Sequence, residues 1–306
     1  MTLEQLRIFV AVAAREHMTA AARDLNLTQS AISAAIAALE NRYDARLFDR
    51  IGRGIVLTDA GRAFLGEAKA VLARARSAEA TLADFAGLRR GAVALGASQT
   101  AGNYWLPQLV SRFVAAYPGI AVSLAIDNTR SIARMTHDGD IDIGYVEGDA
   151  PEAALLVERV ADDEMLLVAA PDHPWVARPP RAMADFAAAR WVFREQGSGT
   201  RAAAEAALAT LGLPAPEIRI ALEFPSNEAV RGAVEAGAGV AVLSRLVAMR
   251  AIRAGLLGVV DVALPTRSFH SLRHKDRFLT TAMRAFMALV AEESGPGVAG
   301  TANQIP

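Results

Sequence analysis

The segment Ala20–Glu40, AAARDLNLTQSAISAAIAALE, contains two helical stretches separated by one short turn. The first stretch is expected to be a short helix with Thr19 as its N-cap, and residues 26–27 form the turn. Thr28 then caps a longer helix, because a threonine hydroxyl can accept a hydrogen bond from the free N–H groups of a first turn. Two capped helices joined by a tight turn predict a helix-turn-helix at about residues 18–37.

The longer helix has one apolar and one polar face. Ile32, Ile36, Leu39 and Tyr43 recur at helical spacing and share the apolar face. The opposite face carries small or polar side chains that fit the major groove of DNA, where serine and glutamine bond to base edges and an alanine methyl touches a thymine methyl. The candidate DNA-reading residues of this helix are Thr28, Gln29, Ser30, Ser33 and Ala34.

The segments on either side complete a winged helix-turn-helix domain, which we call the head. Thr2 and Gln5 form a capping box that begins a first helix. Downstream, residues 46–57 are interpreted as strand, glycine turn and strand, which is a wing. Arg50 and Arg53 on this wing are expected to contact phosphates or a minor groove. The alternative is a plain three-helix bundle whose serines are merely solvated.

Beyond Thr58, apolar residues alternate spacings of four and three, as in a heptad repeat. This seam predicts a long helix that pairs two chains, and the alternative is an amphipathic helix packed on its own domain. A dimer would place two heads on a dyad-symmetric DNA site. The predicted dimerisation residues are Phe64, Ala68, Val71, Ala75, Ala78, Leu82 and Phe85.

From Gly91 onward, short apolar strands alternate with amphipathic helices, which predicts an α/β domain with a mostly parallel sheet. Ligands of such sheets bind beyond the carboxyl ends of the strands, next to helix N-termini. Hydroxyl groups and free N–H groups there suit a carboxylate, sulfate or phosphate, although each serine or threonine could simply cap its own helix. The polar residues at these points are Ser98, Gln99, Thr100, Asn128, Thr129, Glu147, Ser198, Gly199 and Thr200.

The segment Ala20–Glu40, with Leu47-Phe48-Asp49-Arg50 and Leu57-Thr58-Asp59-Ala60-Gly61, resembles the DNA-binding domain of LysR-type transcriptional regulators. Many such relatives carry a long polar residue near Ala34 or Ala35, whereas this helix has small side chains. We therefore expect DNA shape to carry more of the specificity than direct base contacts.

Residues 91–293 resemble the effector domain of the same family, which is similar to two-lobed periplasmic binding proteins. The segments 194–201, 226–230 and 272–275 are most similar to regulators of sulfur-assimilation and carbon-fixation operons. The resemblance implies effector contacts at the residues after the first strand, at Thr129 and at 198–200, with Phe224 and Ser226 near the mouth. It also implies that dimers pair into tetramers, and RNA polymerase is a candidate further partner.

The expected fold is therefore an all-α winged head joined to an α/β domain, and the expected function is that of a DNA-binding transcription regulator. A small, anionic metabolite between the lobes would change DNA binding or bending. We divide the chain into a head (1–58), a linker or dimerisation helix (59–90), an effector-binding domain (first lobe about 91–162 and 267–293, second lobe about 163–266) and a tail (294–306) that we expect to be disordered.

Other classes of protein are disfavoured. The first 90 residues carry 13 Lys and Arg against 10 Asp and Glu, a mild basic excess in a chain of net charge −1. No phosphate-binding loop, nucleophile elbow or metal-ligand spacing occurs and cysteine is absent, so we expect neither an enzyme nor a metal or other cofactor. No apolar run reaches the roughly 18 residues of a membrane span and no secretion signal is found, which predicts a cytoplasmic protein without membrane contact and argues against a periplasmic solute-binding protein.

Overall fold

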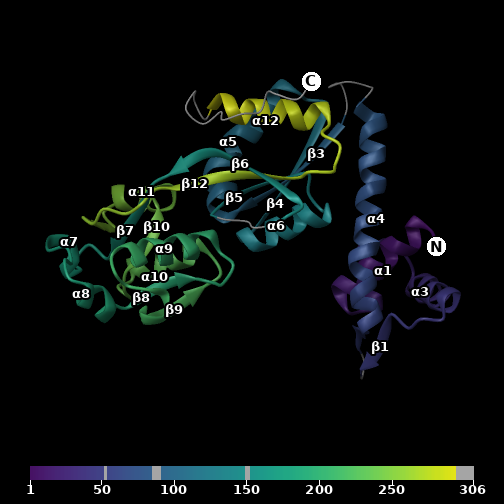
Figure 1. Cartoon of the computed structure of the whole chain (residues 1–306), viewed down its shortest axis with the longest axis horizontal. Helices are drawn as coiled ribbons and strands as arrows, with labels where there is room; N and C mark the ends of the chain where they lie inside the picture. Colours follow the sequence, from purple (N-terminus) through teal and green to yellow (C-terminus); the bar gives the residue numbers. More distant parts are fainter. Residues whose placement is uncertain (52–53, 85–90, 149–151, 294–306) are drawn as a thin grey trace. The chain divides into compact units, whose positions relative to one another are not determined.

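The computed structural model describes residues 1–51, 54–84, 91–148 and 152–293, which form two compact units divided at Leu82 (Figure 1). Among these residues, no helix is long and apolar enough to cross a membrane. Unit 1 contains α1 (Leu3–Arg15), α2 (Met18–Asp24), α3 (Gln29–Tyr43), β1 (Phe48–Ile51), β2 (Gly54–Leu57) and α4 (Asp59–Asp84).

Unit 1 is built around Phe9 of α1, which is fully buried. Its ring lies 5.4 Å from that of Phe48 on β1 and 5.0 Å from that of Phe64 on α4, so the wing and the long helix share one core with the three helices. The Glu40 carboxylate accepts hydrogen bonds from the backbone N–H groups of Leu47 (2.7 Å) and Phe48 (3.2 Å), which joins the end of α3 to the wing.

The predicted caps of unit 1 are confirmed with one exception. Thr2 and Gln5 form the capping box of α1, and Thr28 accepts from Ala31 N at the start of α3. The prediction that Thr19 caps the second helix is wrong, because α2 begins earlier. Its N-cap is His17, whose ring Nδ1 lies 3.3 Å from Ala20 N and accepts that hydrogen bond.

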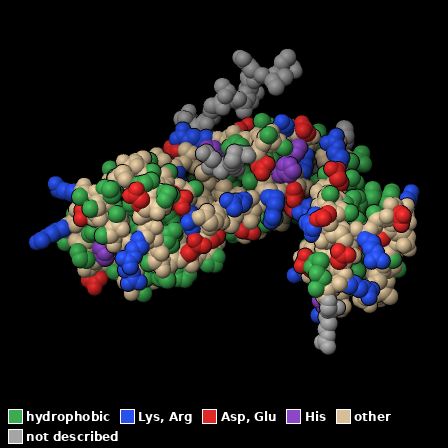
Figure 2. Space-filling model, turned by 60° about the horizontal axis from the view of Figure 1, so that its bottom comes forward, with side chains coloured by type: hydrophobic (Ala, Val, Ile, Leu, Met, Phe, Trp, Pro, Cys, Tyr) green, Lys and Arg blue, Asp and Glu red, His purple; other side chains and the backbone are tan. Residues whose placement is uncertain are grey.

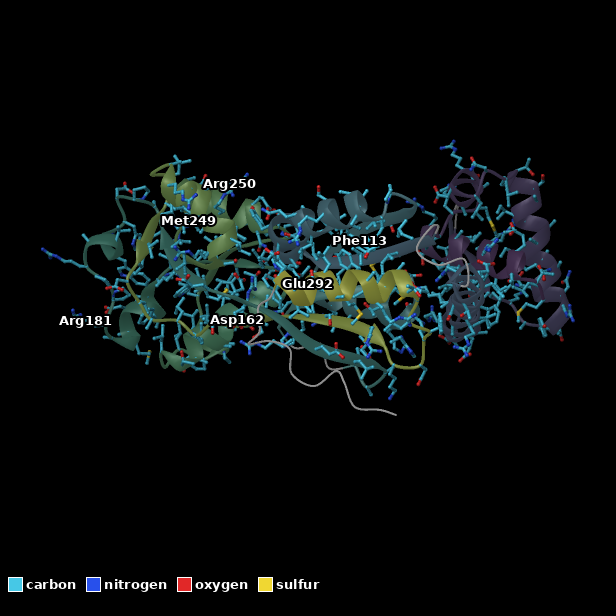
Figure 3. All side chains as sticks on the ribbon, turned by 90° about the horizontal axis from the view of Figure 1, so that it is seen from above. Phe113, Asp162, Arg181, Met249, Arg250 and Glu292 are labelled. Atoms are coloured by element: carbon cyan, nitrogen blue, oxygen red, sulfur yellow. The ribbon has the colours of Figure 1, made fainter. Side chains whose placement is uncertain are left out.

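Unit 2 has two lobes. The first lobe is a five-stranded sheet in the order β4-β3-β5-β12-β6, with α5 and α12 covering one face and α6 the other (Figure 1). Phe113 of α5 meets Phe286 of α12 with ring centroids 5.2 Å apart, and Figure 3 shows the two helices in this layer. The elements of this lobe are β3 (Gly91–Ser98), η2 (Ala101–Trp105), α5 (Leu106–Ala116), β4 (Ile120–Asp127), α6 (Thr129–Asp138), β5 (Ile143–Glu147), β6 (Leu155–Asp163), β12 (Arg267–His274) and α12 (Thr281–Glu293).

The second lobe contains the sheet β10-β7-β11 and the strand pair β8-β9, packed with helices around two apolar clusters. Trp191 at the start of β8 is fully buried there and bridges in parallel to Val240. The elements of this lobe are β7 (Met165–Ala169), α7 (Pro174–Ala177), α8 (Met183–Ala188), β8 (Trp191–Arg194), α9 (Gly199–Thr210), η3 (Ala215–Glu217), β9 (Ile220–Phe224), α10 (Asn227–Glu235), β10 (Ala241–Ser244), α11 (Arg245–Arg253) and β11 (Gly258–Val260).

The expectation of a mostly parallel sheet is wrong for this unit. β3 is parallel to β4 and β5, but β12 is antiparallel to β5 and β6, and β7 is antiparallel to β10 and β11. The reason lies in the connections between lobes. β6 leaves the first lobe and β12 returns to it, so the two strands run in opposite directions side by side, with Asp163 paired to Arg267 at the crossing.

Candidate functional site

A cavity of about 450 Å³ lies between the two lobes of unit 2, within the range of small-molecule pockets. The first lobe contributes the first turns of α6, the end of β5, Gly148 and Glu152. The second lobe contributes residues 196–199 and the first half of α9. Five charged side chains line this space: Arg130, Glu147, Glu152, Arg201 and Glu205.

Two helices from different lobes begin at this cavity. α6 begins after Asn128, whose side chain accepts from Ser131 N at 3.0 Å, and α9 begins after Ser198, which accepts from Arg201 N at 3.4 Å. Of the other first-turn N–H groups, that of Arg130 donates to the Gly197 oxygen of the second lobe at 3.2 Å, the rest have no partner within their own helix, and the helix dipole adds partial positive charge. The arrangement therefore suits a negatively charged group.

The start of α9 packs directly against the end of β5. A Cβ added at Gly199 would lie 2.2 Å from the backbone oxygen of Glu147 and 2.6 Å from the hydroxyl oxygen of Thr129. The Thr129 hydroxyl in turn donates a 3.1 Å hydrogen bond to the same Glu147 oxygen. Only glycine permits this approach, so the lobes contact each other at one rim of the cavity.

The Glu147 side chain is 2 % exposed, although it lines the cavity. Its Oε1 lies 3.5 Å from the Nη2 of Arg267, whereas its Oε2 has no hydrogen-bond partner among the described residues. A buried carboxylate oxygen without a partner is costly, because it has lost its water and gained nothing in exchange.

Arg267 joins the lobes at their crossing, a role that no local sequence pattern indicates. Its guanidinium contacts Asp163 through Nε (2.8 Å) and Nη2 (2.7 Å) and donates to the hydroxyls of Thr100 (3.1 Å) and Thr200 (3.2 Å). Asp163 also accepts from Ser244 at 2.6 Å. Burial raises the pKa of the Asp163 carboxyl above its usual range, although Arg267 and Ser244 oppose this shift.

A second set of contacts between lobes surrounds the N-terminus of α10. The Gln99 side chain accepts from Asn227 N at 3.1 Å and donates to the Pro225 oxygen at 2.8 Å. The buried Asn227 amide donates to Thr100 Oγ1 at 3.1 Å. The start of α10 is therefore already occupied by first-lobe side chains.

Arg194 and Glu195 form a third link. Arg194, buried at the end of β8, bonds to both carboxylate oxygens of Glu195 (2.7 and 3.0 Å) and to Asn227 Oδ1 (2.6 Å). Asn128 of the first lobe donates to Glu195 Oε1 at 3.1 Å. Burial would raise the pKa of Glu195, but the hydrogen bonds and charge of Arg194, with help from Asn128, hold it below its ordinary value.

The structure brings four of the predicted effector residues to the cavity, namely Thr129, Glu147, Ser198 and Gly199. Thr100 and Thr200 lie behind it as partners of Arg267, and Ser98 is buried with no hydrogen-bond partner for its hydroxyl among the described residues. Gln99, Asn128 and Ser226 serve the links and caps between lobes, and Phe224 ends β9, half-buried. Arg194 and Arg267 were missed because only the fold reveals their partners.

In unit 1, α3 exposes the predicted DNA-reading face. Thr28, Gln29, Ser30 and Ala34 are exposed and Ser33 is half-buried. Gln29 Nε2 donates to Ser33 Oγ at 3.2 Å and the Thr28 and Ser30 hydroxyls lie 3.0 Å apart. Tyr43 is 55 % exposed, because α3 ends at this residue, past the core.

The structure describes only part of the wing and of the heptad seam along α4. Arg50 is exposed on β1, whereas Arg53 lies outside the described residues. Along α4, Ala68 is buried in the head, Phe64 and Ala75 are half-buried, and Val71 (41 %), Ala78 and Leu82 (74 %) are exposed. Phe85 and the tail 294–306 also lie outside the described residues. On the face shown in Figure 2, basic and acidic side chains are interspersed in each unit.

An exposed recognition helix with a wing, and a two-lobed domain with a cavity between its lobes, together define a DNA-binding regulator with a sensing domain. Residues 3–62 match the model for "Bacterial regulatory helix-turn-helix protein, lysR family", and residues 86–295 match "LysR substrate binding domain". The chain belongs to the LysR family of transcriptional regulators. No cluster of His, Asp and Glu suited to a metal ion is found among the described residues.

The similar proteins are regulators and not enzymes. An uncharacterized HTH-type transcriptional regulator, YeiE, of Escherichia coli K12 is 35 % identical, and the match covers 94 % of this chain and 96 % of the relative. The RuBisCO operon transcriptional regulator of Allochromatium vinosum is 31 % identical, covering 96 % and 97 %. The name of this second relative agrees with the predicted resemblance to carbon-fixation regulators.

Solved structures show the same fold. Full-length CbnR complexed with its target DNA is 22 % identical with a TM-score of 0.68, covering 96 % of this chain and 100 % of that one. The regulatory domain of CcmR from Synechocystis PCC6803, in complex with 2-PG, is 25 % identical with a TM-score of 0.62, covering 68 % and 99 %.

Proposed function

We propose that this regulator senses a small anionic metabolite in the cavity between its lobes. The observation that carries the proposal is the convergence of the α6 and α9 N-termini, one from each lobe, on a single cavity. An anion placed there would interact with both lobes at once and favour the arrangement in which they are closed. The CcmR regulatory domain in complex with 2-PG supports a ligand site in this kind of domain.

We assign the direct effector contacts to the four predicted residues at the cavity, Thr129, Glu147, Ser198 and Gly199. Thr100 and Thr200 act through Arg267, since their hydroxyls accept from its guanidinium. The other predicted residues, Ser98, Gln99, Asn128, Phe224 and Ser226, act on the closure of the lobes.

The output is DNA binding by a dimer paired along α4, which then pairs into a tetramer. Effector binding changes how the sensing domains pack, and so changes the separation of the heads on a dyad-symmetric promoter site and the bending of the DNA. Thr28, Gln29, Ser30, Ser33, Ala34, Arg50 and Arg53 contact the DNA. The protein acts in the cytoplasm, where the DNA lies, and RNA polymerase is its further partner.

The test is a coupling measurement on the full chain. Its affinity for a duplex of its own promoter region and for a random duplex is measured by fluorescence anisotropy, with and without phosphate, sulfate and small carboxylates at constant ionic strength. We expect preference for the promoter, and a change of roughly 5- to 150-fold caused by at least one anion. Equal affinity for both duplexes would overturn the DNA-binding proposal, and an anion affinity that is the same with and without promoter DNA would overturn the coupling.

A further inference from the structure

The unpaired oxygen of Glu147 limits which anions the cavity can accept. Glu147 is buried, lines the cavity, and leaves Oε2 without a hydrogen-bond partner among the described residues. Asp163, the other buried carboxylate of this cluster, differs, because Ser244 occupies one of its oxygens and Arg267 the other. Of these two buried carboxylates, only Glu147 therefore has an oxygen without a hydrogen-bond partner among the described residues.

Among the described residues, neither Arg267 nor Arg201 supplies a hydrogen bond to that oxygen. Arg267 gives its short contacts to Asp163 and reaches Glu147 only at Oε1, at 3.5 Å. Arg201 is engaged by Glu205 at 2.8 Å and by Glu223. Two carboxylates thus share the one guanidinium of Arg267, and negative charge at Glu147 remains unbalanced at the cavity wall.

Another part of the same cavity wall carries positive charge. The N-termini of α6 and α9 supply partial positive charge, although Arg130 N already donates to the Gly197 oxygen, and the exposed Arg130 guanidinium has no ion pair among the described residues. A bound ligand must therefore direct negative charge toward the helix N-termini and Arg130, and a hydrogen-bond donor toward Glu147. An anion that has only acceptors would place its lone pairs against a buried carboxylate. Binding sites use such repulsion to reject unwanted ligands.

Resting on the proposed function, we propose that Glu147 is a specificity-determining residue that selects anions bearing an O–H or N–H donor beside the negative charge. Hydrogen phosphate and small 2-hydroxy- or 2-aminocarboxylates belong to this class. Sulfate, which is fully ionised at neutral pH, and plain carboxylates do not. Glu147 accepts the donor's hydrogen bond while the helix N-termini hold the charge.

Two matched pairs of probes test the proposal on the full chain without DNA. Phosphate against sulfate, and lactate against propionate, are titrated by calorimetry at pH 7 and constant ionic strength. A hydrogen bond to a buried charged acceptor predicts that the donor-bearing member of a pair binds roughly 10- to 100-fold more tightly. Glu147→Gln replaces the acceptor oxygen with a donor N–H, so the phosphate preference should fall at least about tenfold and sulfate binding should improve.

Glu217→Gln, at an exposed position on η3 outside the cavity, is the matched control and should keep the wild-type preference. Thermal denaturation of each variant checks the fold, and the lactate and propionate pair tests the wild type even if Glu147→Gln unfolds. Equal affinities within both pairs would overturn the inference while leaving an anion site in place. Binding of none of the four probes would instead overturn the proposed anion site itself.

Discussion

The hydroxyl of Tyr104 donates a 2.9 Å hydrogen bond to the carboxylate of Glu228. Tyr104 lies on η2 of the first lobe, Glu228 lies in the first turn of α10 in the second lobe, and the Tyr104 ring packs against the second lobe's apolar cluster. Burial, followed by the hydrogen bond to Glu228, raises the pKa of Tyr104 to about 12. The phenol therefore remains a donor throughout the physiological pH range, and the bond helps to hold the lobes closed.

Removing this hydroxyl should loosen the closed arrangement. Tyr104→Phe keeps the ring and loses one bond to a charged acceptor, so we expect a loss of about 1–2 kcal/mol in the free energy of unfolding. If closure favours ligand binding, the affinity for the best-binding anion should also fall severalfold. Urea denaturation and calorimetry measure the two effects. Tyr117→Phe, at the C-terminus of α5, is the control, and equal losses in the two variants would contradict a special role for Tyr104.

The Glu195 ion pair should make stability depend on pH. Its pKa in the folded state lies below the ordinary value of about 4.3, so the folded state holds the proton less tightly than the unfolded chain. The pair's contribution is therefore complete above that value and is lost as the pH falls through the lowered pKa. We expect Glu195→Gln to cost about 1–2 kcal/mol at pH 7, and the difference from wild type to shrink below about pH 4.3.

Urea denaturation at a series of pH values measures this difference. Glu292→Gln, at an exposed position on α12 that Figure 3 labels, is the control. A difference between Glu195→Gln and wild type that stays constant from pH 7 down to pH 3 would show that the carboxylate's charge is not what stabilises the fold.

The contact at Gly199 should not tolerate a side chain. A Cβ there would lie 2.2 Å from the Glu147 oxygen, which is backbone and cannot swing away. We expect Gly199→Ala to separate the start of α9 from β5, to cost about 1–3 kcal/mol of stability and to weaken anion binding. Gly232→Ala on α10 is the control, since its Cβ would meet nothing within 4 Å and alanine favours a helix. Equal stability of the two variants, measured by thermal denaturation, would refute the argument.

The helix caps and the winged head could be predicted because each depends on residues close in sequence. Thr28 caps α3 with an N–H only three residues away, and the wing follows from a short apolar pattern. The exception at α2 shows the limit, since a histidine ring performs a role usually given to serine or threonine. The mixed strand directions, by contrast, depend on which strands cross between lobes.

Arg267 shows why the site could be predicted only in part. Its partners Thr100, Asp163 and Thr200 lie 67 to 167 residues away along the chain, and only the pairing of β12 with β6 sets Arg267 beside Asp163. Polar residues at strand ends could be found by their position, which is why Thr129 and Glu147 were predicted. A charged residue that other segments enclose has no comparable local signal.

The DNA-contacting residues of the head should divide into those that read bases and those that contact the DNA backbone. Gln29→Ala removes a side chain that can bond to a base edge, so we expect a loss of about 1–3 kcal/mol on the promoter site and almost none on random duplex. Arg50→Ala removes a charge from the wing, so it should weaken both and reduce the salt dependence by one phosphate contact. Fluorescence anisotropy at several salt concentrations measures both effects. If Gln29→Ala weakened binding to both duplexes and Arg50→Ala weakened binding to the promoter alone, the base-reading surface would not lie on α3.

The exposed seam of α4 should pair two chains. Val71 and Leu82 are large apolar side chains that the described residues of one chain leave exposed, and α4 is roughly 39 Å long at about 1.5 Å per residue. Leu82→Glu would bring two carboxylates together in a dimer without disturbing the core of a single chain, so we expect a shift toward monomer. Ala70→Glu adds the same charge at an exposed position off the seam and should leave the dimer intact. Light scattering at micromolar concentration distinguishes the two variants. If the wild type had the mass of one chain, or if both variants had equal masses, the chains would not pair along this helix.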